Sequence, residues 1–350
     1  MRKSILLLTA AAMIAMVACK PEEVKPNENP AETTRAYVLN EGAWGGNNAS
    51  LSLITPEGIT NDWFAKSNNR GLGDLAQDMI HYGSKLYVVT NESNTLECID
   101  PATGVSSKQI DMGSRHPRYM VAHKGKIYVS CYDKTVVRID TASLAIDATC
   151  QLSGMQPEQL CVVGENLYVC NSWQNDSNGQ VEYDNTLSVV NLGTYEETGK
   201  ITVASNPTRM KALDDHRLLV ACAGNYADDP ATTLVIDLNT GSQTPLGVAA
   251  TNFDICDGYI YLYCTSYDAN WNATAAFYKV NATTMEATPI LEDYGNDLRN
   301  AYGINVDPTT KNLYVCNSTW SVNGDVFIFS PENKLLGKYE AGIYTSKVVF

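Results

Sequence analysis

A short apolar run recurs along the chain and sets its pattern of hydrophobic and polar positions. The fullest copies are residues 166–173, Asn-Leu-Tyr-Val-Cys-Asn-Ser-Trp, and residues 312–320, which repeat this run with one inserted threonine. Each copy is rich in β-branched or aromatic residues and is bounded by turn residues, which is typical of a buried strand. Weaker copies begin at Ala36, Lys85, Lys126, Arg217 and Tyr259.

The seven copies lie about 40 to 53 residues apart, a spacing typical of propeller repeats. Around most copies the sequence predicts a strand, a tight turn, a strand, a loop, a strand, a turn and a fourth strand. We therefore expect an all-β, seven-bladed β-propeller in which each repeat buries a face against its neighbour. No sustained apolar period of 3.6 follows the first 18 residues, so we expect almost no helix. The blades after the first are expected at about 74–111, 116–152, 156–203, 206–248, 251–291 and 299–342.

The first blade, which begins at Tyr37, is predicted to have only three strands, the last of them at residues 61–64. The C-terminal residues 345–350, Thr-Ser-Lys-Val-Val-Phe, have the composition of a further strand. We expect this segment to complete the first blade, which would close the ring and cover the edges of the first and last blades.

The first 18 residues have the pattern of a lipoprotein signal peptide. A basic start, Arg2-Lys3, precedes a short run of apolar or small residues that is too short to anchor a mature protein in a bilayer. The run ends in Met16-Val17-Ala18-Cys19, which resembles the lipobox of bacterial lipoproteins. This resemblance implies cleavage before Cys19 and lipid attachment to its sulfur; an ordinary secretory signal with a chance cysteine is the alternative.

Residues 19–34 contain three prolines and several charges, and they are predicted to form a flexible tether before a propeller at residues 35–350. The pair Glu22-Glu23, soon after Cys19, resembles the surface-export signal of Bacteroidota lipoproteins. Together these features imply a protein that is lipid-anchored in the outer membrane and faces the cell exterior.

The charge and the reactive side chains exclude several classes of function. The net charge is −14 at pH 7, which disfavours nucleic acid as a partner because its binding depends on basic contacts to phosphate. None of the nine cysteines after Cys19 falls in a C-x-x-C pair, so no metal site is expected. Only four histidines are present, without a convergent cluster or a nucleophile motif. We therefore expect a protein that is not an enzyme and has no catalytic residues.

Loop length points to one functional face. In an up-and-down blade, the loops between the second and third strands and those between blades lie on the same face, and here several second-to-third loops are long. Four of the five tryptophans fall in those loops, and Trp and Tyr offer broad apolar area for a ligand. The alternative explanation for this grouping of tryptophans is chance, or packing of the rings between blades. The predicted ligand-binding residues are Trp44, Asn47, Arg70, Tyr132, Asn171, Trp173, Arg209, Tyr226, Tyr267, Trp271, Arg299 and Trp320.

A further motif is the opening run at residues 37–45, Tyr-Val-Leu-Asn-Glu-Gly-Ala-Trp-Gly. It occurs in the same chain as the lipobox, the acidic tether and the Leu-Tyr-Val-Cys-Asn repeats. Together they resemble the YncE-like propellers of Bacteroidota with the DUF5074 type of opening, most of all the BtuG surface lipoproteins. The resemblance implies non-covalent capture of cobalamin (vitamin B12) or a related corrinoid, without a catalytic cofactor. It also implies transfer of that ligand to a BtuB-like, TonB-dependent outer-membrane transporter.

Two other functions stay open, because propellers host many activities. A glycan- or host-protein-binding surface propeller would use the same aromatic residues, since aromatic rings also stack on sugars. A propeller enzyme, such as a lyase or a quinoprotein-like oxidoreductase, is disfavoured by the scarcity of histidine on the predicted face.

Overall fold

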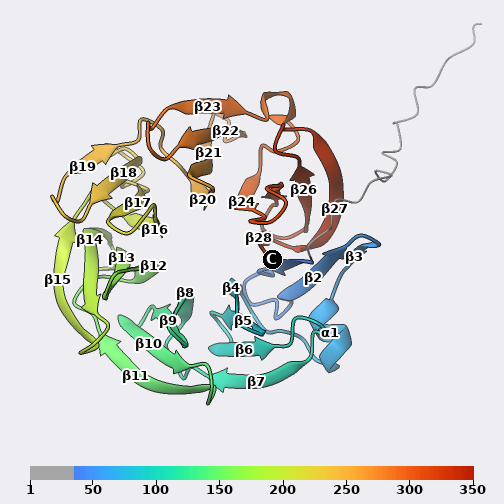
Figure 1. Ribbon diagram of the computed structural model, residues 1–350, viewed down its shortest axis with the longest axis horizontal. Coiled ribbons are helices and arrows are strands. Elements are labelled where there is room, and N and C mark those ends of the chain that lie inside the picture. The colour runs from blue at the N-terminus through green and yellow to red at the C-terminus, as the bar shows by residue number, and fades with distance from the viewer. Residues whose placement is uncertain (1–34) are drawn as a thin grey trace, which may run out of the picture.

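The computed structural model describes residues 35–350, which form a ring of seven four-stranded antiparallel sheets around a central channel (Figure 1). This confirms the predicted all-β, seven-bladed propeller. In blades two to seven the first strand lines the channel and the fourth lies at the rim. The signal peptide predicted for residues 1–18, the tether predicted for 19–34 and lipidation at Cys19 lie outside the described residues.

Blades two to four follow the predicted boundaries closely. Blade two comprises β4 (Ala76–Tyr82), β5 (Lys85–Thr90), β6 (Thr95–Ile99) and β7 (Ser106–Asp111). Blade three comprises β8 (Pro117–His123), β9 (Lys126–Cys131), β10 (Thr135–Asp140) and β11 (Ala145–Gln151). Blade four comprises β12 (Pro157–Val163), β13 (Asn166–Asn175), β14 (Val181–Asn191) and β15 (Glu196–Thr202).

Blades five to seven continue the ring with the same strand order. Blade five comprises β16 (Pro207–Ala212), β17 (Arg217–Cys222), β18 (Thr232–Asp237) and β19 (Gln243–Pro245). Blade six comprises β20 (Asn252–Cys256), β21 (Tyr259–Tyr267), β22 (Ala273–Asn281) and β23 (Ala287–Ile290). Blade seven comprises β24 (Ala301–Val306), β25 (Leu313–Asn317), β26 (Asn323–Phe329) and β27 (Leu335–Ile343).

Blade one is completed by the C-terminus, as predicted. Its sheet runs in the order β28-β1-β2-β3, so the last strand of the chain takes the innermost place. β28 pairs antiparallel with β1, with Val348 opposite Val38. The strands are β28 (Thr345–Val349), β1 (Ala36–Asn40), β2 (Ser50–Thr55) and β3 (Gly58–Thr60).

The strand predicted at residues 61–64 is wrong, because β3 ends at Thr60 and the chain then forms the helix α1 (Trp63–Asn68). Asp62 adopts the left-handed conformation, with φ 55°, and turns the chain out of the sheet. Trp63 and Phe64 are adjacent and both buried. A strand would point two neighbouring side chains to opposite faces, whereas the helix buries both.

In the part of the chain that the structure describes, helix is otherwise confined to a 3-10 turn, η1 (Glu292–Tyr294), which agrees with the prediction of almost no helix. Within residues 35–350, no helix has the length and apolar character needed to cross a membrane.

The recurring apolar run is buried because each blade packs against two neighbours. In β13, Leu167 and Val169 pack in a cluster shared with blade three, whereas Tyr168 and Cys170 pack in a cluster shared with blade five. Successive strand residues point to opposite faces, so a strand covered on both faces must be apolar throughout. All nine cysteines of the described residues are free, and most of them are buried.

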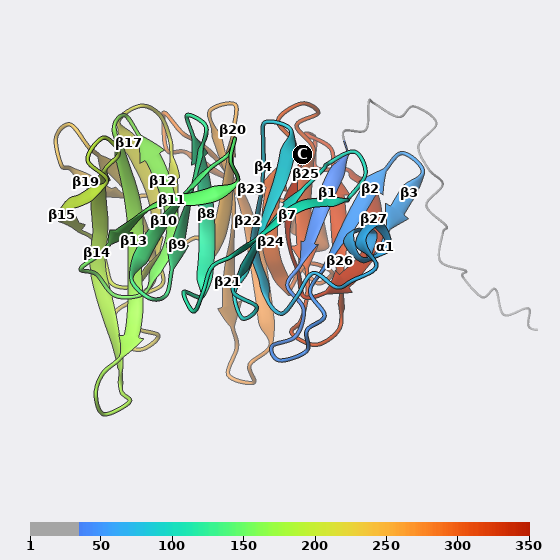
Figure 2. The ribbon, with the colours of Figure 1, turned by 90° about the horizontal axis from the view of Figure 1, so that it is seen from below.

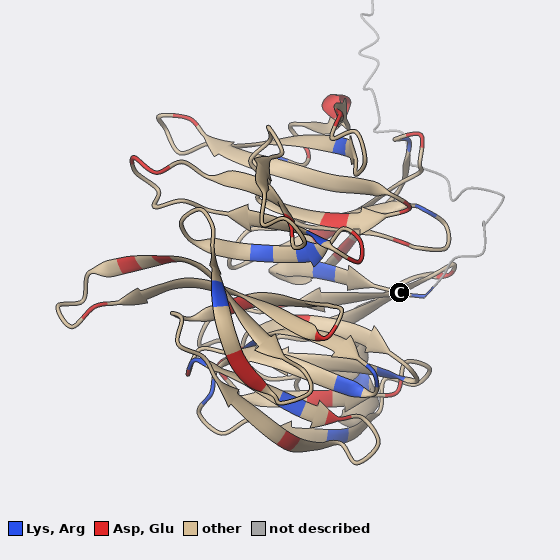
Figure 3. Ribbon diagram, turned by 60° about the vertical axis from the view of Figure 1, so that its left-hand side comes forward, with Lys and Arg blue, Asp and Glu red and all other residues tan. Residues whose placement is uncertain are grey.

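Figure 2 shows that the two faces of the ring differ in their loops, because the β13–β14 and β21–β22 hairpins project well beyond one face. The other face carries tight turns, several of which are closed by an Asp or Asn at the end of the third strand. Asp237, for example, accepts hydrogen bonds from the backbone amides of Asn239 and Thr240, each at 2.9 Å. Charged residues of both signs are spread over the blades (Figure 3).

Candidate functional site

A cavity of about 1230 Å³ opens on the face that carries the long loops. Its lining residues come from blades three to seven and from the turn before β28. Among the described residues, none of blades one and two lines it. The cavity is therefore placed to one side of the ring axis.

Bulges at the start of the inner strands aim polar side chains into the cavity floor. The pairing register shifts between Pro117 and Met120 in β8 and between Pro157 and Leu160 in β12. Proline has no amide hydrogen for the ladder, and a bulge leaves the following residues unpaired and bends the strand. Similar shifts occur in β16 and β24. The residues at these shifts that line the cavity are Arg118, Tyr119, Glu158, Thr208 and Tyr302.

One side of the floor is a closed ion pair. Arg118 donates to both carboxylate oxygens of Glu158, at 3.1 to 3.2 Å. The Tyr132 hydroxyl donates to the same carboxylate at 2.6 Å, and the Arg118 guanidinium lies 4.5 Å from the Tyr132 ring centroid. The Arg118 and Glu158 side chains are largely buried and their charges cancel. This pair therefore forms a rigid, neutral part of the floor.

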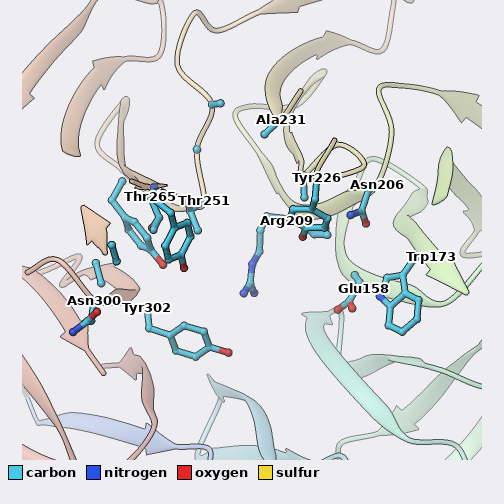
Figure 4. A pocket seen from close by; sticks show the side chains of 18 of the residues that line it. Glu158, Trp173, Asn206, Arg209, Tyr226, Ala231, Thr251, Thr265, Asn300 and Tyr302 are labelled. Carbon is cyan, nitrogen blue, oxygen red and sulfur yellow. Dashed lines mark hydrogen bonds between the residues drawn. The ribbon is translucent and has the colours of Figure 1, made fainter. Parts of the chain in front are cut away.

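The middle of the floor carries a different arrangement. Arg209 reaches toward the centre of the cavity, between Tyr302 and Glu158 (Figure 4). Its Nη1 donates to the Tyr119 hydroxyl at 2.6 Å. Tyr119, Arg209 and Tyr302 also line a second cavity of about 40 Å³ deeper in the channel, so these three side chains separate the two spaces.

Glu41 is a buried acid beneath this floor. It follows β1, lines the smaller cavity and accepts a hydrogen bond from the Tyr302 hydroxyl at 3.2 Å. Burial raises the pKa of Glu41 to about 7, although the charges of Arg118 and Arg209 act to lower it. The site therefore contains a carboxyl group that changes charge near neutral pH.

Glu41 is expected to make the folded protein less stable as pH rises from about 4.5 to 7. Over this window the folded chain holds a proton on Glu41 that the unfolded chain has released, so raising the pH favours unfolding. The free-energy change is on the order of 3 kcal/mol, at about 1.4 kcal/mol per pKa unit. Urea unfolding of the wild type and Glu41→Gln at pH 4.5 and 7.5 measures it. The variant should lose less stability between these values, and an equal loss in both proteins would contradict the assignment.

Exposed aromatic side chains form the walls above this floor. Tyr267 lies with its ring centroid 6.1 Å from that of Trp271, and Trp320 lies 6.2 Å from Tyr344. Tyr344 in turn stacks on Tyr302 of the floor at 4.3 Å. On the opposite side, Tyr226 contacts Tyr183 edge-on. Such rings present broad apolar area to a ligand at little cost in side-chain entropy.

The wall residues are held by turns in their hairpin tips. Tyr226 and Trp271 both have the left-handed backbone conformation, with φ of 58° and 63°. The Asn225 side chain accepts from the amides of Ala227 and Asp229, and Asp268 caps its own turn in the same way. Bulky residues rarely adopt this conformation, so the turn hydrogen bonds are needed to hold the backbone from which the two rings project.

Most of the predicted site residues come together in this cavity. Those that line it are Tyr132, Trp173, Arg209, Tyr226, Tyr267, Trp271, Arg299 and Trp320. They come from blades three to seven, in agreement with a single face built from long loops and segments between blades. Whether they bind a ligand stays a prediction.

Two of the predicted ligand-binding residues lie outside the cavity and instead contact other residues of the protein. The Asn171 side chain is fully buried and donates to the hydroxyls of Thr186 and Ser188 at 2.9 and 3.0 Å. Arg70 pairs with Glu97 at 2.9 Å. Asn171 does not line the cavity because its side chain turns into the sheet, and Arg70 does not because it lies between α1 and β4, in a part of the ring that the cavity does not reach.

Trp44 and Asn47 lie on the same face as the cavity but outside it, in the loop of blade one. Trp44 is 79% exposed. The cavity is displaced toward blades three to seven, so the blade-one loop stands beside it.

The floor residues, including Arg118, Tyr119, Glu158 and Tyr302, are not among the residues predicted from the sequence. A signal for three of them was present, since His116-Pro117-Arg118-Tyr119 and Gln156-Pro157-Glu158-Gln159 both place a proline before polar residues at the start of a blade. Proline inside a strand pattern marks a bulge, and a bulge in an innermost strand faces the channel.

One group of described residues has the spacing of metal ligands, Asp214, Asp215 and His216 in the turn between β16 and β17. His216 Nδ1 lies 2.7 Å from Asp215 and 3.2 Å from Asp214. The group is on the face opposite the cavity, and these ion pairs account for its geometry without a metal.

Comparison with known proteins identifies the domain. A family model described as "Domain of unknown function (DUF5074)" matches residues 35–330. No functionally curated protein matches the chain.

Solved structures share the fold at low sequence identity. A Bacteroides fragilis protein proposed to be a 6-phosphogluconolactonase is 14% identical, with a TM-score of 0.61, over 92% of this chain and 99% of that one. Hydrazine synthase of Kuenenia stuttgartiensis is 15% identical, with a TM-score of 0.61, over 75% and 85%. A streptogramin B lyase is 11% identical, with a TM-score of 0.51, over 75% and 82%. Identities this low establish the propeller fold and leave the activity undetermined.

Proposed function

The chain belongs to the DUF5074 family, and from its own site we propose that it captures cobalamin or a related corrinoid without covalent chemistry. The observation that carries the proposal is the open cavity of about 1230 Å³, with exposed aromatic walls above a polar floor. Small-molecule sites are typically about 300–1,000 Å³, so this cavity suits an unusually large ligand.

The chemistry of the lining matches that of a corrinoid. Cobalamin is a large, roughly disc-shaped corrin with peripheral amides and a nucleotide phosphate. Trp173, Trp271 and Trp320 offer apolar surfaces for the corrin rim, and Asn300 offers an amide donor and acceptor. Affinity would come mainly from the aromatic walls, and orientation from the polar groups.

We propose binding without catalysis in this cavity. Among the described residues, the lining contains no histidine, cysteine or lysine, which are common catalytic bases and nucleophiles. Two carboxylates line the cavity: Glu158, which is held in its ion pair with Arg118, and Asp229 of the loop between β17 and β18. We therefore place no reaction step in this cavity.

The cellular role proposed here rests on the sequence. Met16-Val17-Ala18-Cys19 supports lipid anchoring in the outer membrane, and capture at the cell surface would supply an outer-membrane TonB-dependent transporter. Acyl labelling of the wild type and Cys19→Ser tests the anchor, and co-purification from solubilised outer membranes tests the transporter contact. Absence of label or of a co-purifying transporter would remove the corresponding part of the proposal.

The purified protein is expected to bind cyanocobalamin one-to-one in calorimetric titration. Replacing both Trp271 and Trp320 by alanine should weaken binding by about 1000-fold, because aromatic anchors that a ligand buries each contribute about 2 kcal/mol and each 1.4 kcal/mol is about tenfold in affinity. Trp44→Ala is a matched control, since Trp44 is as exposed as Trp320, at 79%, and lies outside the cavity. Its affinity should stay within about twofold of wild type. Equal losses in the control and the double variant would contradict this site.

A glycan is the alternative ligand. Trp271 and Trp320 are both more than three-quarters exposed, and exposed indole faces are suited to stacking on sugars. Absence of cyanocobalamin binding, together with retention on a glycan array, would favour this function.

A further inference from the structure

Three arginines line the cavity, and their charges are balanced in different ways. Arg118 is neutralised by Glu158. Arg299 lies at the exposed rim, where water solvates its guanidinium. Arg209 lies in the floor, stacks 5.1 Å from the Tyr119 ring centroid and donates one hydrogen bond, to the Tyr119 hydroxyl. Within residues 35–350, no carboxylate forms an ion pair with Arg209.

The groups around Arg209 do not fully balance its charge. The Tyr302 hydroxyl donates to Glu41 and so does not offer its proton to the cavity. Glu41 is the acid beneath this part of the floor, and burial raises its pKa to about 7, so its negative charge at neutral pH is only partial. A partly buried cation without a full partner is costly unless a ligand supplies the missing charge.

We propose that Arg209 is an oxyanion subsite at the cavity floor and binds the anionic group of a ligand whose apolar body lies against the aromatic walls. A guanidinium has five donors in a planar fork, which matches two oxygens of a phosphate or carboxylate. Arg209 uses one of these donors within the protein. Resting on the proposed function, the bound group is the nucleotide phosphate of cobalamin.

A pair of corrinoids tests this assignment. Cobinamide keeps the corrin and its amides but lacks the nucleotide and its phosphate. Arg209→Gln should weaken cyanocobalamin binding by about 10- to 100-fold, the range expected for a hydrogen-bonded charge, and cobinamide binding by less than about threefold. Arg209→Lys, which keeps the charge but not the fork, should fall between the wild type and Arg209→Gln.

Inorganic phosphate tests the subsite independently of corrinoids. Phosphate should raise the thermal midpoint of the wild type above that in sodium chloride of equal ionic strength, and this difference should shrink in Arg209→Gln. Arg217→Gln is the matched control, since Arg217 lies on the opposite face and pairs with Asp214. It should respond to phosphate as the wild type does.

The outcomes separate the two proposals. Failure of the wild type to bind either corrinoid would overturn corrinoid capture. The difference in thermal midpoint between phosphate and sodium chloride would then be the one test of the oxyanion subsite. Wild-type binding with equal losses for cyanocobalamin and cobinamide in Arg209→Gln would overturn the subsite and leave corrinoid capture standing. An equal response to phosphate in wild type and Arg209→Gln would also overturn the subsite.

Discussion

Deleting residues 345–350 is expected to abolish cooperative folding of the whole ring. The deletion removes β28, the innermost strand of blade one, and exposes the edge of β1. It also removes contacts to both neighbouring blades: Val348 donates its amide to Asn305 of blade seven at 2.9 Å, and Lys347 pairs with Asp78 of blade two at 2.5 Å. Blades one, two and seven would each lose packing, because every blade depends on its neighbours.

Circular dichroism during heating and gel filtration measure this effect. The truncated chain should show no sharp unfolding transition and should elute as aggregate. A matched control removes residues 177–179 from the exposed tip of the β13–β14 hairpin, where no core side chain is lost. That variant should melt close to the wild type. A truncated chain that stays monomeric and melts within a few degrees of the wild type would contradict the closing role of β28.

Glu158→Gln is expected to destabilise the protein by about 3 kcal/mol. The substitution keeps the shape of the side chain and an oxygen for the Tyr132 hydroxyl, but it leaves the Arg118 charge buried without its partner. Breaking a buried pair by removing one charge typically costs about 3–5 kcal/mol. Urea unfolding of the wild type and the variant measures the difference.

A double variant separates charge from packing. Replacing Arg118 with methionine in the Glu158→Gln background removes the unpaired cation, so the double variant should be more stable than Glu158→Gln. Lys124 and Glu165, whose pair is largely exposed at 3.2 Å, supply the surface control. Glu165→Gln should change stability by less than about 1 kcal/mol. A Glu158→Gln effect as small as this would show that the floor pair is dispensable for stability.

The fold could be predicted because its determinants are local and repeated. Strands covered on both faces must be apolar throughout, so the run at residues 166–173 and its copies mark the second strand of each blade. Closure by residues 345–350 could be predicted because blade one lacked a strand. The strand predicted at residues 61–64 was wrong because Asp62 has a left-handed backbone conformation, after which the chain forms the helix α1.

The candidate site was less predictable, because it depends on register. Loop length predicted that Trp173, Trp271 and Trp320 share one face, and the structure brings these three side chains to one cavity. The direction of a side chain within a strand depends on pairing, so Asn171 was predicted to face a ligand although it is buried. The position of the floor residues depends on bulges in four inner strands. A bulge changes which face of the sheet each following side chain points to, and composition does not reveal where a bulge occurs.

The start of β1 has a practical consequence for presenting this protein on a surface. Arg35 hydrogen bonds the carbonyls of Pro101 and Ala102, in a tight turn on the face opposite the cavity. Phe350, at the other end of the chain, lies on that same face beside His81. A solid support or fluorophore coupled at Phe350 would therefore leave the mouth of the cavity toward bulk solution. The chain can be immobilised in a uniform orientation for ligand measurements without an internal attachment site.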